Sequence, residues 1–63
     1  MKLRIIKDGQ NRIVGQLAEH TNVTFVRDPL GRPKGQYRKS ADRTYDATGK
    51  YFGEGDQTMR LLK

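Results

Sequence analysis

The residues whose types and spacing best suit chemistry form a basic run between positions 27 and 43, where only Asp28 and Asp42 are acidic. Lysine and arginine side chains in such a run neutralise phosphates, and tyrosines among them, here Tyr37 and Tyr45, offer rings on which unpaired bases stack. We therefore expect a basic surface that engages an acidic partner, with nucleic acid slightly favoured over acidic protein. The residues predicted to bind are Arg27, Arg32, Lys34, Arg38, Lys39, Arg43 and Tyr37.

A second interpretation of the same run is structural. Lysine and arginine on the edge of a sheet keep that edge from pairing with another chain, and charge alone discriminates weakly between the two roles. The sequence contains no helix-turn-helix pattern, no zinc-finger spacing and no aromatic signature of an RNA-recognition sheet. Any binding of nucleic acid is therefore expected to depend mainly on phosphate contacts and to weaken as salt is added.

The residues that could support catalysis are few. His20 is the one histidine of the chain. It falls in a predicted connection between strands, without a nearby serine, cysteine or second histidine with which to form a nucleophile pair. Since no set of nucleophile, base and orienting group can be assembled, we expect a solvated histidine and a non-enzymatic protein without a cofactor.

Three aspartates, Asp8, Asp28 and Asp46, introduce turn-like segments and raise the question of a calcium site. A calcium loop needs alternating oxygen ligands that end in a bidentate glutamate, and none of the three segments supplies them. We expect the aspartates to cap turns instead, with no metal bound. The segment Gly53-Glu54-Gly55 lacks the Lys-Ser or Lys-Thr of a phosphate-binding loop, and we interpret it as the end of a strand.

The same aspartates open three copies of a degenerate repeat of 18 to 20 residues. Each copy reads Asp, two variable residues, Gly or Asn, Arg or Lys, two variable residues, Gly, and then Gln or Glu. One two-stranded hairpin and a connection fit this spacing. The predicted fold is all-β: an antiparallel meander of three β-hairpins, with a short C-terminal helix or tail.

The turn chemistry predicts a register for each hairpin. A type I turn followed by a left-handed residue suits the three loops, in which Asn11, Gly31 and Gly49 take the left-handed position. The residue before each loop then faces the residue after it, which gives three pairs of opposite charge. Continuing this register along the strands, away from the loops, also places two large residues opposite glycines. The predicted pairs are Asp8 with Arg12, Asp28 with Arg32, Asp46 with Lys50, Ile5 with Gly15 and Phe25 with Gly35.

Because side chains alternate along a strand, this register predicts two surfaces. The candidate core surface carries Leu3, Ile5, Ile13, Leu17, Val23, Phe25, Pro33, Tyr37, Tyr45 and Tyr51. The opposite surface, which we expect to be exposed and mostly basic, carries Arg4, Ile6, Arg12, Val14, Gln16, Thr24, Val26, Arg32, Lys34, Gln36 and Arg38.

The C-terminal segment is expected to cover part of the apolar surface. Asp56 is placed to cap a short helix that runs through Lys63, with Met59 and Leu62 on one side. A helix of this length must dock on the sheet to form at all. The alternative, suggested by Leu61, is an extended tail.

Bulk composition limits the size of the core. A chain of 63 residues with 33% hydrophobic residues and no cysteine is expected to form one small domain, 1–63, of marginal stability. We therefore expect the hairpins to fold partly over one another and two chains to pair by the apolar surface as a homodimer. The N-terminus has no signal-peptide core or membrane span, which predicts a cytoplasmic protein. The net charge of +6 favours acidic partners.

Two resemblances extend this prediction. The segment Tyr45-Asp46-Ala47-Thr48-Gly49-Lys50, and less clearly Val26 to Arg32, resembles the YD or RHS-type repeat, whose units are short β-hairpins. Members of that family build large β-sheet shells, but three units cannot close a shell, so that role does not transfer. The chain is also similar to small hairpin-repeat proteins of phages and other mobile elements, which end in segments like Gly53-Glu54-Gly55 and Leu61-Leu62.

The second resemblance implies a compact all-β meander of phage or prophage origin. It does not indicate a mechanism. It leaves open an alternative function, which is a protein-interaction or structural module. Such a module would dock on another protein by its apolar face, or by adding a strand at an open sheet edge.

Overall fold

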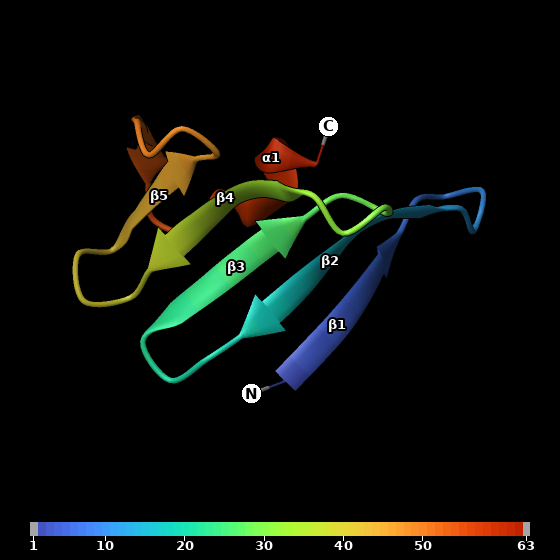
Figure 1. Ribbon diagram of the computed structural model, residues 1–63, viewed down its shortest axis with the longest axis horizontal. Coiled ribbons are helices and arrows are strands. Elements are labelled where there is room, and N and C mark those ends of the chain that lie inside the picture. The colour runs from blue at the N-terminus through green and yellow to red at the C-terminus, as the bar shows by residue number, and fades with distance from the viewer. Residues whose placement is uncertain (1, 63) are drawn as a thin grey trace.

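The computed structural model describes residues 2–62 and contains a single antiparallel sheet of six strands in the order β1-β2-β3-β4-β5-β6 (Figure 1). This confirms the all-β meander of three hairpins. The hairpins lie side by side in that sheet, so the expectation that they fold over one another is wrong. The elements are β1 (Lys2–Lys7), β2 (Ile13–Glu19), β3 (Val23–Arg27), β4 (Pro33–Arg38), β5 (Arg43–Asp46), β6 (Tyr51–Glu54) and α1 (Thr58–Leu61).

The three repeat turns share one hydrogen-bond pattern. In the second copy, Oδ1 of Asp28 accepts the backbone N–H of Leu30 at 2.9 Å and that of Arg32 at 2.8 Å. Asp8 and Asp46 accept the equivalent pair of N–H groups in their own turns. The left-handed position is occupied as predicted, with φ of 63° at Asn11, 86° at Gly31 and 88° at Gly49. Turn capping by the aspartates is therefore confirmed.

Two of the three predicted charge pairs form ion pairs that close their hairpins. Arg32 Nε lies 2.8 Å from Asp28 Oδ2, and Arg12 Nε lies 3.3 Å from Asp8 Oδ2. In the third copy, Lys50 donates its backbone N–H to Asp46 Oδ1 at 3.0 Å. These donors lower the pKa of the carboxyls: at Asp8 and Asp28 the main cause is the backbone N–H of the paired arginine, and at Asp46 it is the Thr48 hydroxyl.

A bulge interrupts each hairpin six residues after its aspartate. In the first hairpin Lys7 pairs with Ile13 but Ile6 pairs with Gly15, so Val14 is an extra residue. The same shift occurs at Lys34 and at Phe52 in the other two hairpins. The predicted pairing of Ile5 with Gly15 and of Phe25 with Gly35 is therefore wrong. The glycines pair with Ile6 and with Val26, one position along.

Because one extra residue moves every later side chain to the other face, the bulges also correct the predicted surfaces. Leu17 and Tyr37 lie on one face with Thr24 and Val26, which were expected to be exposed. The other face, which we call the open face, gains Gln16, Gln36 and Arg38 and keeps most of the residues predicted for the core. Those residues are Leu3, Ile5, Ile13, Val23, Phe25, Pro33, Tyr45 and Tyr51.

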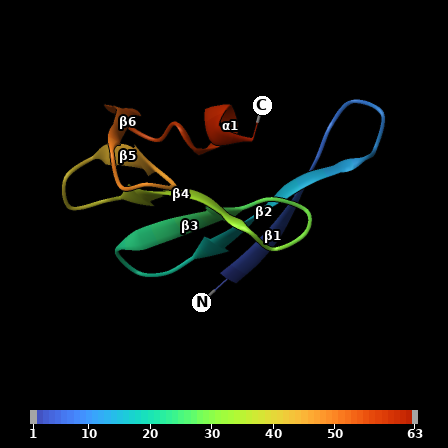
Figure 2. The same ribbon diagram turned by 45° about the horizontal axis from the view of Figure 1, so that its top comes forward.

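The core lies on the face opposite the open face, which we call the covered face, and the C-terminal segment packs against it (Figure 2). Val26 and Thr44 are fully buried there. Thr44 Oγ1 donates to the Gly55 carbonyl at 2.8 Å and accepts the Gln57 N–H at 2.9 Å, which ties the segment to β5. Gly15, Leu17, Thr24 and Thr58 are also buried on this face, and Ala18 is buried although it lies on the open face.

The repeat glycines create the space for that segment. A Cβ at Gly15 would collide with Leu62, one at Gly35 would approach Leu61 Cδ1 to 2.8 Å, and one at Gly53 would lie 3.1 Å from Gln57 Cγ. Each copy of the repeat therefore contributes one glycine on which the C-terminal segment lies. This conflicts with the expectation that large side chains from neighbouring strands cover these glycines.

The predicted C-terminal helix is present but short. Asp56 Oδ1 accepts the backbone N–H of Thr58 at 3.1 Å, as a capping residue does, although Gln57 is the residue that flanks the helix. The side facing the sheet carries Leu61 and Leu62 rather than Met59, which is 44% exposed. Lys63, the predicted end of the helix, lies outside the described residues. Over residues 2–62 no helix is long and apolar enough to cross a membrane.

Candidate nucleic-acid interface

The open face is built around one row of residues that crosses every strand of the sheet. Each member is the direct partner of the next, so all six side chains project from the same face. The half on β3 to β6 contains three aromatic rings and one amide. From β1 to β6 the row reads Leu3, Ala18, Phe25, Gln36, Tyr45 and Tyr51.

Cationic residues flank this row on both sides. Arg38 pairs with Arg43 in the neighbouring row, and Arg27 pairs with Pro33 in the row on the other side. Two arginines placed directly opposite each other repel, and pairs of like charge are normally avoided in sheets. The Arg38–Arg43 pair therefore concentrates positive charge at one place on the open face and does not stabilise the pairing of β4 with β5.

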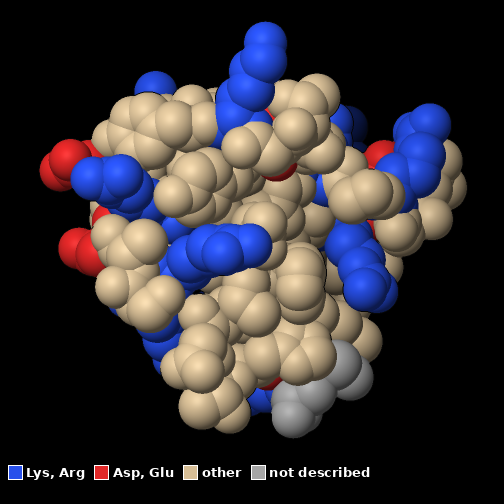
Figure 3. Space-filling view, turned by 60° about the vertical axis from the view of Figure 1, so that its left-hand side comes forward, with Lys and Arg blue, Asp and Glu red and all other residues tan. Residues whose placement is uncertain are grey.

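On β4 to β6, a pair of arginines lies in the row next to a pair of tyrosines. The Arg38 guanidinium carbon lies 6.0 Å from the centre of the Tyr45 ring, and that of Arg43 lies 5.9 Å from the centre of the Tyr51 ring. These distances fall at the outer limit of a cation–π contact. Each guanidinium therefore lies near a ring, on a residue that is exposed to solvent. Figure 3 shows Lys and Arg side chains standing out from uncharged surface on one side of the molecule.

The ion pairs of residues 2–62 leave these arginines without an acidic partner. Arg4, Arg12 and Arg32 are the three cations that form ion pairs there. Glu54 is the acid nearest in register, since it pairs with Arg43 across β5 and β6, but no ion pair joins the two side chains. An external anion can therefore approach Arg27, Arg38 and Arg43 without displacing an internal carboxylate.

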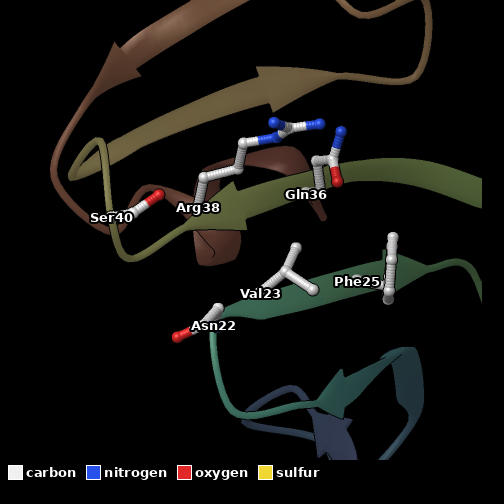
Figure 4. Close-up of a pocket in the computed structure, with 6 residues that line it drawn as sticks. All are labelled: Asn22, Val23, Phe25, Gln36, Arg38 and Ser40. Carbon is white, nitrogen blue, oxygen red and sulfur yellow. The ribbon is translucent and has the colours of Figure 1, made fainter.

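Gln36 lies where three shallow hollows of the open face meet. A hollow of about 270 Å³ lies among Val23, Phe25 and Arg38 and the ends of the adjoining turns, and Figure 4 shows these side chains on β3 and β4. A second, of about 320 Å³, is bordered by Arg38 and Tyr45. The third, of about 190 Å³, lies beside Phe25. Flat rings or bases can enter such hollows from solvent, because they are open rather than enclosed.

The structure separates the seven residues predicted to bind. Arg27, Arg38 and Arg43 lie on the open face, with the Arg38–Arg43 pair on one side of the central row and Arg27 on the other. Arg32 is held in its turn by Asp28, and Lys34 is the extra residue of a bulge. Lys39 lies in the turn after β4, where its backbone N–H donates to the Asn22 carbonyl at 3.0 Å. The basic run therefore forms no continuous patch.

Tyr37 does not belong to the candidate interface. It pairs with Thr44 on the covered face, and its hydroxyl donates to Asp42 Oδ1 at 2.8 Å. That hydrogen bond to a carboxylate is the main reason the pKa of the Tyr37 phenol is raised. The residues that take its place, and that sequence reasoning did not select, are Phe25, Gln36 and Tyr51. Phe25 and Tyr51 stay on the surface predicted for them, whereas Gln36 changes face because of the bulge at Lys34, for which the repeat glycine Gly35 was the signal.

The N-terminal half of the open face is apolar. Leu3, Ile5 and Ile13 are about half exposed, at 53%, 48% and 50%. His20 also lies at this half, with its ring edge-on to Phe25 at 5.4 Å between centres. His20 is exposed in the connection between β2 and β3, as expected of a solvated loop histidine, and its ring also contacts Phe25. Over residues 2–62, no group of three or more His, Cys, Asp or Glu could hold a metal ion.

Comparison with protein families, with curated proteins and with solved structures finds no match to this chain. The resemblance to YD or RHS-type repeats and to phage hairpin-repeat proteins therefore stays a prediction. Function has to be argued from the open face itself.

Proposed function

We propose that the protein is a small non-enzymatic binding module that engages nucleic acid through the β3 to β6 part of its open face. The observation that carries this proposal is that Arg38 and Arg43 share one uncovered face with Tyr45 and Tyr51. Phosphates would lie against the guanidinium groups, and the rings would contact sugars or bases. We also predict that the protein is cytoplasmic and that it comes from a phage or prophage.

The open face favours nucleic acid over an acidic protein. A nucleic acid presents regularly spaced phosphates and flat bases together, and this face offers arginine and aromatic groups in adjacent rows. An acidic protein would engage the arginines but would leave the exposed tyrosine rings unused. Arginine also suits phosphate better than lysine does, since its planar group can form two parallel hydrogen bonds.

The experiment that tests the proposal is a mobility-shift titration of the whole chain with single- and double-stranded DNA and RNA at two salt concentrations. Contacts to three or four phosphates predict that affinity falls about 30-fold or more between about 50 and 200 mM salt. Binding that is absent for every nucleic acid, or that does not change with salt, would contradict the proposal.

A second candidate function has its own observation in its favour. Leu3, Ile5 and Ile13 expose aliphatic surface on the N-terminal half of the open face, and β1 is an edge strand of the sheet. A protein partner or a second copy could dock there by apolar contact or by strand addition. Under this function Ile5→Ser removes the association and Arg38→Glu with Arg43→Glu has little effect. Under the leading function the effects of the two variants are reversed.

A further inference from the structure

We infer that the ligand of the open face is a single-stranded nucleic acid whose bases stack on Tyr45 and Tyr51. The inference rests on the proposed function and narrows it to one class of ligand. Its basis is the geometry of the aromatic row, not the charge.

The two tyrosines are direct partners on neighbouring strands, and Tyr51 is 55% exposed. Neighbouring strands are about 4.8 Å apart, so the two rings offer adjacent platforms within reach of successive bases. Base pairs in a duplex are already stacked on both sides and turn their phosphates outward. A duplex could use the arginines of this face, but it would leave the rings without a base to contact.

The arginines lie where the backbone of such a strand would pass. Arg38 and Arg43 form the row next to the rings, and each guanidinium lies about 6 Å from a ring centre, at 6.0 and 5.9 Å. A nucleotide with its base on a ring therefore has its phosphate within reach of an arginine. This combination of a cationic track and stacking rings is how proteins hold single strands without reading their sequence.

Gln36 adds a polar group between the rings of Phe25 and Tyr45 in the same row. An amide can donate and accept hydrogen bonds at the exposed edge of an unpaired base. Because the hollows on both sides of Gln36 are open, a base that stacks on Tyr45 can place its edge against this side chain. We therefore assign Gln36 a positioning role, with one strand of the ligand crossing β4 to β6.

The test is a set of fluorescence-anisotropy titrations with labelled 12-nucleotide ligands. The ligands are single-stranded DNA, single-stranded RNA, a DNA duplex, and an abasic oligonucleotide that keeps the phosphates but lacks the bases. We expect the affinity for one or both single strands to be higher than that for the duplex and the abasic ligand by about 10-fold or more. Comparing the DNA and RNA arms shows which sugar is preferred.

Two matched variants separate stacking from charge. Tyr45→Leu with Tyr51→Leu keeps apolar side chains but removes the rings, and it should weaken binding of the single strand about 10-fold or more while binding of the abasic ligand is unchanged. Tyr45→Phe with Tyr51→Phe keeps the rings and should bind like the wild type. Far-UV circular dichroism of each variant shows whether the fold is retained. If the leucine variant does not fold, the abasic and duplex ligands with the wild-type chain still decide the question.

Equal affinity for single strand, duplex and abasic ligand would overturn the inference and leave the proposed function standing. No binding to any of the four ligands would overturn the proposed function as well. If a second copy of the chain occupies the open face, sedimentation will show a stable dimer, and added oligonucleotide will not dissociate it. This result would also overturn the inference.

Discussion

Gly35 lies directly beneath Leu61, so closely that a Cβ on the glycine would come within 2.8 Å of Leu61 Cδ1 and would collide with the Tyr45 carbonyl oxygen. This contact joins the middle hairpin to the C-terminal segment. It also decides which face of the sheet is covered and, by exclusion, which face is left for a ligand.

Gly35→Ala should be strongly destabilising. Its Cβ meets the backbone as well as a side chain, and the φ of 150° at this residue is rarely adopted by residues other than glycine. We expect unfolding free energy to fall by about 2 kcal/mol or more in urea denaturation, or the chain to remain unfolded. Gly9→Ala is the matched control, because nothing lies within 4 Å of a Cβ there. Equal stability of the two variants would contradict the packing described.

The two leucines of the C-terminal segment should each contribute more to the stability of the fold than Met59 does. Leu61 and Leu62 are partly buried over glycines, whereas Met59 is exposed. Leu61→Ala or Leu62→Ala is expected to cost about 1–2 kcal/mol, and Met59→Ala less than about 0.5 kcal/mol. Thermal denaturation followed by circular dichroism measures the difference. A Met59→Ala variant less stable than either leucine variant would show that another side of α1 faces the sheet.

Thr44→Val tests the hydrogen bonds that tether the segment. The hydroxyl is fully buried and bonds to both Gly55 and Gln57, and valine keeps its shape but not these bonds. Leaving the Gln57 N–H and the Gly55 carbonyl without this partner should cost about 1–3 kcal/mol. Thr21→Val, at an exposed connection, is the control and should change stability little. Denaturant titration of both variants gives the comparison.

Acid should destabilise the protein through the repeat aspartates. The pKa of the Asp28 carboxyl lies below its ordinary value, mainly because it accepts a hydrogen bond from the Arg32 backbone N–H. A carboxyl whose pKa is lower in the folded state stabilises the fold at pH above its unfolded pKa, and this stabilisation is lost as pH falls through the folded pKa. Stability should therefore decrease below about pH 4.

Asp28→Asn should flatten this acid dependence, because the amide does not titrate, while its oxygen can still accept the turn N–H groups. Asp8→Asn and Asp46→Asn are expected to act in the same direction, since the pKa of each carboxyl is also lowered. Urea denaturation at several pH values between about 2 and 6 measures the slope. A slope that is the same in all three variants as in the wild type would contradict this account.

The turns could be predicted from the sequence, and the assignment of the faces could not. Asp28, Gly31 and Arg32 specify a local hydrogen-bonded loop, which depends on neighbouring residues alone. Which face the C-terminal segment covers involves contacts such as that between Gly35 and Leu61, a residue 26 positions away in the chain. The bulge at Lys34 changes the face of every later side chain of β4, so Tyr37 lies outside the candidate site and Gln36 lies within it.

The central claim is that the open face, and not the overall positive charge, binds nucleic acid. Its most direct test compares two double charge reversals by anisotropy with the same single-stranded ligand at fixed salt. Arg38→Glu with Arg43→Glu changes the open face, whereas Lys2→Glu with Arg60→Glu makes the same change in net charge away from that face. We predict a loss of about 100-fold or more for the first variant and less than about 3-fold for the second. Equal losses, or no loss in the Arg38 and Arg43 variant, would contradict the claim.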